Sequence, residues 1–394
     1  MLARKIAMRR RTLATLGLVL AASIGLAALL LPAGRESSPE AFDAPRAKTI
    51  WPLEPAEAES LRTAALRRAR VWAPADTATA DLGSNPADPT GTLSGPMVRC
   101  HYLDGPVHGT TAKFDCVLRD GEVVKVKYGH TGEIPAEVAA SRLLAALGFG
   151  ADRMFLIPRL RCYGCVRTPF YTYWLLDRLR AHGLLARHVP DDRYSDFVWA
   201  SVERHFGGST IETPQHRGWA WYELEPVDSS LGASRDERDA FRLAAVLLAH
   251  WDNKASNQRL VCLAPADAGT NTSNCPRPFA LINDLGATFG PNKVDLEHWE
   301  ATPVWADRIR CTVSMRELPY EGSTFPDTRI SESGRQLMAR ALSALSETQV
   351  LSLFRGARFG EFYGGKGNEG DASAWTRAFL DKAAQITNGE PCPQ

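Results

Sequence analysis

Two short polar motifs in the middle of the chain contain the groups that phosphoryl transfer requires. They read HWDNKASN at positions 250–257 and NDLG at positions 283–286. Such a reaction needs a carboxylate that accepts the proton of the attacking hydroxyl, and a lysine that offsets charge on the transferred group. It also needs an amide oxygen and a second carboxylate that hold magnesium against the phosphates. These requirements predict Asp252 and Lys254 as catalytic residues and Asn257 and Asp284 as magnesium ligands.

The spacing of these residues is similar to that of the catalytic loop of protein kinases and its Asp-Phe-Gly partner. On this pattern the chain resembles the protein-kinase-like superfamily, in a divergent form. Ala255 stands where many kinases have proline, and Asn257 and Asp284 lie farther apart than in a typical protein kinase. The alternative interpretation is a polar turn after a buried helix, followed by an unrelated Asp-Leu-Gly turn.

The residues between the two motifs predict a hairpin that is lengthened by a looped insertion. Strands are expected at 260–263 and 279–282, and the segment between them is rich in Pro, Gly and Asn. Such an insertion does not move the ends of the hairpin, because loop entropy grows slowly with loop length. Cys262 and Cys275 are expected to form the disulfide that closes the insertion.

Upstream of these motifs, the pattern of apolar residues predicts strands and then a helix. Strands are expected at 98–103, 114–118 and 123–128, then a helix that ends before Gly148, and another strand at 154–160. This order of hairpin, helix and strand is the one that the small lobe of a kinase requires. The resemblance therefore extends upstream of the catalytic motifs.

A kinase also needs a lysine on the third strand of this lobe, paired with a glutamate on the following helix. Lys125 and Lys127 share one face of the expected strand, because side chains alternate along a strand with period two. Lys127 is preferred, because Lys-Tyr-Gly followed by Glu137 and a Leu-rich helix resembles the HipA-type kinases. Lys125 is the second choice. The alternative is a pair of solvated lysines on an edge strand.

A turn one strand before these lysines has residues suited to phosphate binding. Gly109, Thr110 and Thr111 offer backbone N–H groups and hydroxyls that can bind phosphate oxygens. The turn resembles the phosphate loop of HipA-type and lipid-kinase-like proteins, although it is neither G-x-G-x-x-G nor a Walker A motif. An ordinary hairpin turn explains it equally well. With the other motifs, the resemblance implies ATP and Mg²⁺ as cofactors.

The composition of the chain is that of a globular protein, with 394 residues, 44% hydrophobic and 23% charged. The formal net charge of +1 gives no field that would recruit nucleic acid, and no nucleic-acid partner is expected. The expected fold class is α+β, a two-lobed protein-kinase-like fold preceded by an N-terminal membrane helix. A small antiparallel-sheet lobe with one helix is expected at 96–222, and a mostly helical large lobe at 223–394.

Three further segments are assigned by composition and pattern. A linker interrupted by one helix is expected at 35–95, and an insertion rich in Arg, Tyr, Trp and His at 161–216. An apolar-aromatic strand at 219–224 is expected to lead into the hinge between the lobes, where backbone groups of kinases meet adenine. The large lobe is expected to contain helices at 235–248, 332–345, 347–354 and 372–386.

The N-terminal residues predict a membrane segment and export of the rest of the chain. A basic tail at 1–11 precedes an uncharged stretch at 12–34 that is rich in Leu and Ala. Its length fits one membrane span or a long signal sequence. The basic flank favours a cytoplasmic N-terminus. The residues LPAGR at 31–35 make a poor cleavage site. This favours a single-pass anchor over a domain that is secreted or periplasmic after cleavage.

All eight cysteines follow this segment, and an even number in an exported domain indicates disulfides. Cys162 and Cys165 fit a tight disulfide, half a zinc site or a redox pair. No second C-x-x-C or histidine pair completes a zinc set, and no βαβ pattern supports a thioredoxin-like role. The export signal and the cysteines also resemble those of secretory-pathway kinases.

These observations favour a membrane-tethered, exported phosphotransferase that moves the γ-phosphate of ATP to an unknown acceptor, with a protein hydroxyl preferred. A second interpretation is a pseudokinase that binds nucleotide or a partner without turnover. This would remove the conflict between catalysis and the lack of an ATP supply outside a bacterial cytoplasm. A third is an AMP transferase on the same fold, because the orientation of the nucleotide decides which phosphate is attacked.

Overall fold

The computed structural model describes residues 32–36, 55–107, 109–180, 189–263, 275–319, 322–362 and 371–393. The predicted membrane segment at 12–34 lies outside these ranges except at its end. Among the described residues, no helix has the length and apolar character needed to span a membrane. The chain divides into two units. Unit 1 contains residues 88–129 and 157–202 with the described N-terminal residues, and unit 2 contains residues 55–87, 130–156 and 203–393.

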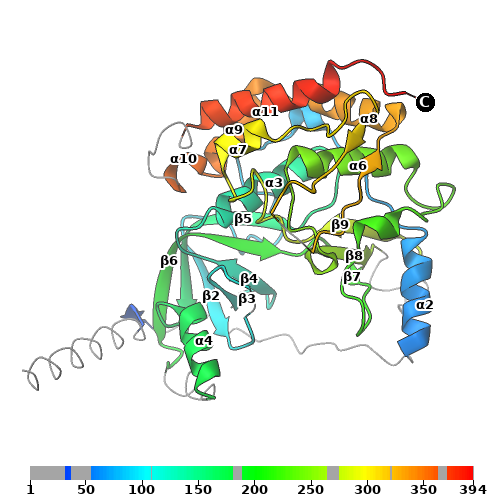
Figure 1. Ribbon diagram of the computed structural model, residues 1–394. Coiled ribbons are helices and arrows are strands. Elements are labelled where there is room, and N and C mark those ends of the chain that lie inside the picture. Colours follow the sequence, from blue (N-terminus) through cyan, green and yellow to red (C-terminus); the bar gives the residue numbers. More distant parts are fainter. Residues whose placement is uncertain are drawn as a thin grey trace, which may run out of the picture. The chain divides into compact units, whose positions relative to one another are not determined.

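Unit 1 is built around a strongly bent sheet (Figure 1). Its strand order is β1-β6-β4-β3-β2-β5, and β6 also pairs with β5, so the sheet closes on itself. β2 and β3 are antiparallel, β3 and β4 are antiparallel, and β2 is parallel to β5. The strands are β1 (Gly34–Arg35), β2 (Val98–Leu103), β3 (Lys113–Leu118), β4 (Val123–Lys127), β5 (Arg153–Tyr163) and β6 (Arg193–Arg204), and the helix α4 is Pro169–Arg178.

An aromatic cluster fills the inside of this sheet. The ring of Phe197 on β6 lies 5.0 Å from that of Phe114 on β3 and 4.9 Å from that of Tyr128 after β4. The hydroxyl of Tyr128 accepts a hydrogen bond from the backbone N–H of Phe170, at the start of α4. The segment at 161–216 is therefore not a simple insertion, because β6 within it is a strand of the sheet and supplies part of its core.

Unit 2 combines helices with a small antiparallel sheet, β7-β8-β9. Helix α6 contacts α8, and α8 and α9 both contact α11 (Figure 1, green, orange and red). The predicted hairpin and all four predicted helices of the large lobe are confirmed.

The main elements of unit 2 are α2 (Pro55–Leu66), α3 (Glu133–Ala146), β7 (Ser209–Thr210), α6 (Arg235–Leu247), β8 (Gln258–Cys262), β9 (Pro278–Ile282), α7 (Leu296–Ala301), α8 (Glu332–Ser343), α9 (Glu347–Gly356), α10 (Phe359–Phe362) and α11 (Ala372–Thr387). Short elements complete the unit: η1 (Thr77–Thr79), η2 (Trp221–Leu224), η3 (Ala255–Asn257), β10 (Thr312–Val313) and β11 (Thr328–Arg329).

Residues 55–87, predicted to be part of a linker, are instead packed into unit 2. The backbone of Arg70 pairs with β9, since its N–H donates to Pro278 O at 3.0 Å and its carbonyl accepts from Ala280 N at 2.8 Å. Ala69 and Val71, on either side, are fully buried. Composition did not reveal this docking, because the partner strand lies about two hundred residues away in the sequence.

The expected strand at 219–224 is wrong, because residues 221–224 form the short 3₁₀ helix η2. The carboxylate of Glu223 accepts a hydrogen bond from the backbone N–H of Ala220 at 2.7 Å, which caps the start of the turn. Arg62 of α2 holds the same carboxylate with two hydrogen bonds of 2.9 Å. These contacts stabilise a turn where the run of aromatic residues had indicated a strand.

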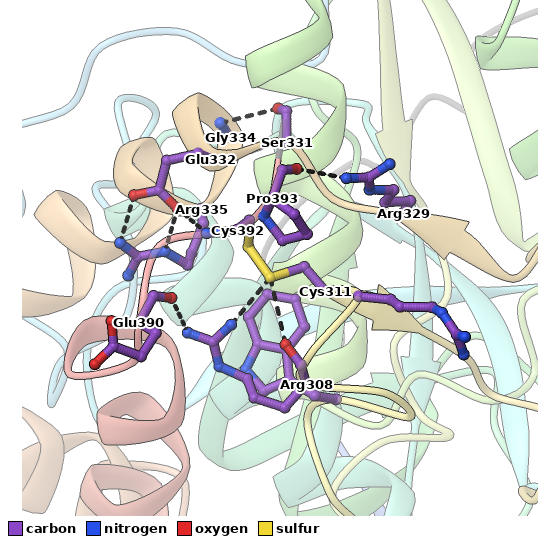
Figure 2. The surroundings of a disulfide bond; sticks show 12 residues. Arg308, Cys311, Arg329, Ser331, Glu332, Gly334, Arg335, Glu390, Cys392 and Pro393 are labelled. Atoms are coloured by element: carbon purple, nitrogen blue, oxygen red, sulfur yellow. Dashed lines mark hydrogen bonds and ion pairs between the residues drawn. A yellow bond between two sulfur atoms is a disulfide. The ribbon is translucent and has the colours of Figure 1, made fainter.

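All eight cysteines lie within the described residues and form disulfides. The predicted pair Cys262–Cys275 is confirmed, and Cys162 bonds to Cys165. Cys100–Cys116 joins β2 to β3, and Cys311–Cys392 ties the C-terminal residues to the loop before β10. Figure 2 shows that side chains reinforce the last of these bonds: Arg329 donates to Pro393 O at 2.6 Å, and Glu332 accepts from Cys392 N at 2.7 Å.

Candidate functional site

Helix α6 positions the first motif. It begins with a capping box, in which the Ser234 hydroxyl accepts from Glu237 N at 3.2 Å and the Glu237 carboxylate accepts from Ser234 N at 2.7 Å. Its residues 238–247 are all buried, so the helix is fixed by packing over most of its length. The chain then leaves the helix at Ala249, which has a left-handed backbone (φ 51°), and enters the loop that starts at His250.

Backbone hydrogen bonds join the two motifs directly. The carbonyl of Asn257 accepts hydrogen bonds from Asn283 N at 2.9 Å and from Asp284 N at 3.1 Å. The hairpin β8–β9 makes this contact possible, because Gln258 at its start pairs with Ile282 at its end. The two predicted magnesium ligands are therefore neighbours in space, although 26 residues separate them in the sequence.

Asn257 is oriented by the loop that precedes it. Its side-chain amide nitrogen donates to the carbonyl of Asp252 at 2.6 Å, which leaves the amide oxygen as the atom available to a ligand. On the other side of the pair, Asp284 accepts a hydrogen bond from the backbone N–H of Gly286 at 3.1 Å. Amide and carboxylate oxygens are the ligands that Mg²⁺ prefers, so these residues fit the metal.

Asp252 lies half-buried at the centre of the first motif. One carboxylate oxygen is 3.1 Å from the ammonium group of Lys254. The other oxygen is buried and makes no hydrogen bond to any described residue. A buried acceptor without a partner is costly in a folded protein, so this oxygen requires a partner from outside the described residues, which can be water, a ligand or a substrate. The structure thus brings together all four residues predicted from the two motifs: Asp252, Lys254, Asn257 and Asp284.

His250 is fully buried beneath this loop. Burial lowers its pKa to about 4, against the opposing effect of the carboxylates of Asp284 and Asp252. The imidazole is therefore neutral at pH 7. Gln258 lies beside it with a nitrogen-to-nitrogen distance of 3.5 Å.

Asn253 is a residue of the site that the sequence interpretation passed over. It is completely buried, and its side-chain oxygen accepts from Ser323 Oγ and Thr324 N at 2.9 Å and from Phe325 N at 3.1 Å. Its amide nitrogen donates to His250 O at 3.1 Å. Asn253 thus ties the segment 323–325 to the loop that carries Asp252 and Lys254. The sequence signal that could have identified Asn253 is its polar side chain within the first motif.

Glu133 is a second residue that was not predicted. It lies at the start of α3 and accepts a hydrogen bond from Lys293 at 2.5 Å. A Cβ atom added to Gly286 would lie only 2.2 Å from Cγ of Glu133, so the glycine of the Asp-Leu-Gly turn is required for this close approach. Glu137 follows one helical turn later on the same face of α3 and is buried.

The remaining predicted residues belong to unit 1 and are described within it. Lys127 is 1% exposed and lies on β4, which has β6 on one side and β3 on the other, so the alternative of two solvated lysines on an edge strand is wrong for this residue. Lys125 is partly exposed on the same strand, opposite Asp115. Gly109, Thr110 and Thr111 lie in the turn before β3; Gly109 has φ 89° and Thr111 is buried.

No protein-family model and no curated protein sequence matches this chain. Among solved structures, it is similar to the Helicobacter pylori proinflammatory kinase CtkA, at 9% identity with a TM-score of 0.37, over 74% of this chain and 98% of that one. It is also similar to the Golgi casein kinase with Mn/ADP bound, at 12% identity with a TM-score of 0.33, over 75% and 74%. Scores below 0.5 do not establish a common fold, so the assignment of function depends on the site itself.

Proposed function

We propose that this protein is an ATP-dependent phosphotransferase of the protein-kinase-like type. The observation that carries the proposal is the direct hydrogen bonding of Asn257 to the Asn283–Asp284 backbone, which unites two separate motifs in one place. Two unrelated polar turns would not be expected to share these backbone hydrogen bonds. The acceptor that we prefer is a protein hydroxyl, and the group transferred is the γ-phosphate.

In this proposal, Asp252 accepts the proton of the attacking hydroxyl. Its buried oxygen without a hydrogen-bond partner among the described residues is the atom available for that proton. Lys254, 3.1 Å from the other oxygen, holds the carboxylate in place and offsets negative charge on the transferred group. His250 stays neutral, so it adds no positive charge that would compete with Lys254.

Asn257 and Asp284 would hold the magnesium ion. When bound, magnesium neutralises the charge of the phosphates. The chain's part is to present two oxygen ligands in a fixed arrangement: the amide of Asn257 is locked by Asp252 O at 2.6 Å, and Asp284 by the turn at Gly286. The disulfide Cys262–Cys275 closes the insertion between β8 and β9 and so supports the hairpin that aligns these residues.

The residues of unit 1 and of α3 are proposed to bind the nucleotide. Lys127 would neutralise the α- and β-phosphates, with Glu137 as the orienting glutamate and Lys125 as the second choice for the lysine. The turn containing Gly109, Thr110 and Thr111 would bind phosphate oxygens through its backbone and hydroxyls. The burial of Lys127 supports its choice, since a buried lysine requires compensating groups.

We also propose that the domain is exported and remains tethered to the membrane by residues 12–34, with the basic tail at 1–11 in the cytoplasm. The four disulfides support an oxidising compartment, because such bonds persist outside the cytoplasm and are rare within it.

The experiment that tests the function uses the full chain with γ-labelled and α-labelled ATP in separate reactions, each with and without a chelator of divalent metals. Metal-dependent transfer of the γ-label to protein supports the proposal. Transfer of the α-label would instead assign AMP transfer. Metal-dependent binding of ATP without transfer of either label, to the chain itself or to an added protein mixture, would indicate a pseudokinase and overturn the proposal.

A further inference from the structure

Four cysteines of unit 1 lie together: three are on different strands, and Cys165 lies shortly after the end of β5. Cys100 on β2 is directly opposite Cys162 on β5 in the parallel pair, and Cys116 lies on the neighbouring β3. The sulfurs of these three residues all lie within 4.8 Å of one another. Cys165 is the fourth, because its sulfur is bonded to that of Cys162. Two disulfides are thus stacked side by side.

One distance between the two disulfides agrees with the spacing of a tetrahedral metal site. With zinc–sulfur bonds of about 2.3 Å, two sulfurs of a tetrahedral zinc site are about 3.8 Å apart. The sulfurs of Cys116 and Cys162, which belong to different disulfides, are 3.8 Å apart. All four cysteines are at most 1% exposed, so water is excluded and a bound ion would have thiolates as its ligands.

The ligand set also follows a common pattern for structural zinc. Cys162 and Cys165 form a C-x-x-C pair, which is half of such a set. A second C-x-x-C is absent from the sequence, and this argued against zinc. The fold supplies the second half differently, through Cys100 and Cys116, which β-pairing brings next to the first pair.

We propose that in the reduced chain Cys100, Cys116, Cys162 and Cys165 bind one Zn²⁺ ion as four thiolates, and that the two disulfides are the oxidised, metal-free form of the same site. On oxidation, the zinc–sulfur bonds break, two sulfur–sulfur bonds form and Zn²⁺ is released. The electrons pass to two equivalents of a two-electron oxidant, such as protein disulfides, each of which takes up two protons to become a dithiol. This proposal is independent of phosphotransferase activity.

Zinc would therefore hold β2, β3 and β5 together wherever the chain is reduced, whereas after oxidation the disulfide Cys100–Cys116 joins only β2 to β3. The other disulfide, Cys162–Cys165, closes a short turn at the end of β5 and joins it to no other strand, so zinc would add a sulfur-mediated link between β5 and its neighbours that the oxidised form lacks. Each form also satisfies sulfurs that would otherwise be four buried thiols.

The test titrates the full chain, reduced with a phosphine under anaerobic conditions, with Co²⁺ and then Zn²⁺. One equivalent of Co²⁺ should give the intense visible absorption of a tetrahedral tetrathiolate site, and one equivalent of Zn²⁺ should remove it. X-ray absorption of the zinc form should show four sulfur neighbours at about 2.3 Å. The untreated, oxidised chain should bind no metal at this site.

Two double variants control the assignment. Cys162→Ser with Cys165→Ser should lose the cobalt spectrum, whereas Cys262→Ser with Cys275→Ser, which removes a disulfide in unit 2, should retain it. Absence of stoichiometric binding by the reduced wild-type chain would overturn the proposal. So would a metal with nitrogen or oxygen neighbours, which would indicate the cluster of Asp152, Glu203 and His205 instead. Because these readouts use the wild-type chain, the result does not depend on the folding of a variant.

Discussion

At the scale of single residues, the oxygen atoms of Asp252 are the most informative. One contacts Lys254 and the other is buried without a hydrogen bond among the described residues. A carboxylate that served only to support the loop would use both oxygens for hydrogen bonds, as Asp152 does with Arg259, Phe206 and His205. The oxygen without a hydrogen bond among the described residues is the atom to which we assign the proposed role of Asp252 as proton acceptor.

Asn in place of Asp252 keeps the shape of the side chain and removes its ability to accept a proton. We expect Asp252→Asn to lower turnover by about 10²–10⁴-fold, the usual contribution of a general base. Binding of Mg-ATP, measured by thermal shift, should change little. The control is Asp381→Asn on the exposed side of α11, which should keep full activity. Near-normal turnover of the Asp252 variant would show that another group is the base.

His250 predicts a dependence of stability on pH. Its pKa is about 4 in the folded chain and near 6.5 when unfolded, so the unfolded state binds the proton more tightly. The contribution of His250 to the free energy of unfolding is fully present above pH 6.5 and is lost as the pH falls through 6.5 toward 4. The loss is on the order of 3 kcal/mol. His250→Gln should flatten this part of the curve in denaturant titrations. Parallel curves for the variant and the wild type would contradict this.

At the scale of elements, burial differs between two lysines on the same face of β4, which the sequence could rank only by resemblance. Lys127 is 1% exposed and Lys125 is partly exposed, although both are on the same strand. We expect Lys127→Ala to lower turnover about tenfold more than Lys125→Ala, a difference of about 1.4 kcal/mol in activation free energy. The two variants remove the same charge, so each is the control for the other. An equal loss, or a larger one for Lys125→Ala, would reverse the assignment.

Asn253 joins the loop of the first motif to the segment 323–325. Asn253→Ala would remove the acceptor of the Ser323 hydroxyl and of the Thr324 and Phe325 backbone N–H groups, although Phe325 N–H retains a second acceptor in Ser323 Oγ at 3.3 Å. The free energy of unfolding should fall by about 2 kcal/mol or more. Asn388→Ala, at the exposed end of α11, should change it by less than about 0.5 kcal/mol. Similar unfolding curves for both variants would show that this junction is not important for stability.

Elements with strong local patterns were predictable, and those fixed by distant partners were not. The hairpin β8–β9 and the helix α6 follow from apolar runs, a capping box and turn residues in the sequence itself. The strand character of Arg70 depends on β9, and the turn at Glu223 depends on Arg62 of α2. Likewise, the motif residues of unit 2 could be identified by spacing. The position of Glu133 beside the second motif could not be predicted, because it depends on the close approach of Gly286 in the folded chain.

At the scale of the whole molecule, the two disulfides of unit 2 close loops of very different length. Cys311–Cys392 spans 81 residues and fixes the C-terminal end, which Figure 2 shows held by Arg329 and Glu332 as well. Cys262–Cys275 spans only 13 residues and closes a local loop. In the chain-entropy model, a crosslink restricts the unfolded chain more when the loop is longer.

This difference in loop length predicts which of two matched double variants has the lower free energy of unfolding. Replacing Cys311 and Cys392 by Ser should lower the free energy of unfolding by about 4.5 kcal/mol, and replacing Cys262 and Cys275 by about 3 kcal/mol. All four cysteines are buried, so the local cost of the serines is similar and the difference of about 1.5 kcal/mol reports loop length. Denaturant titration of the oxidised proteins measures it. If the short-loop variant proved the less stable, the insertion itself, rather than chain entropy, would determine the stability of unit 2.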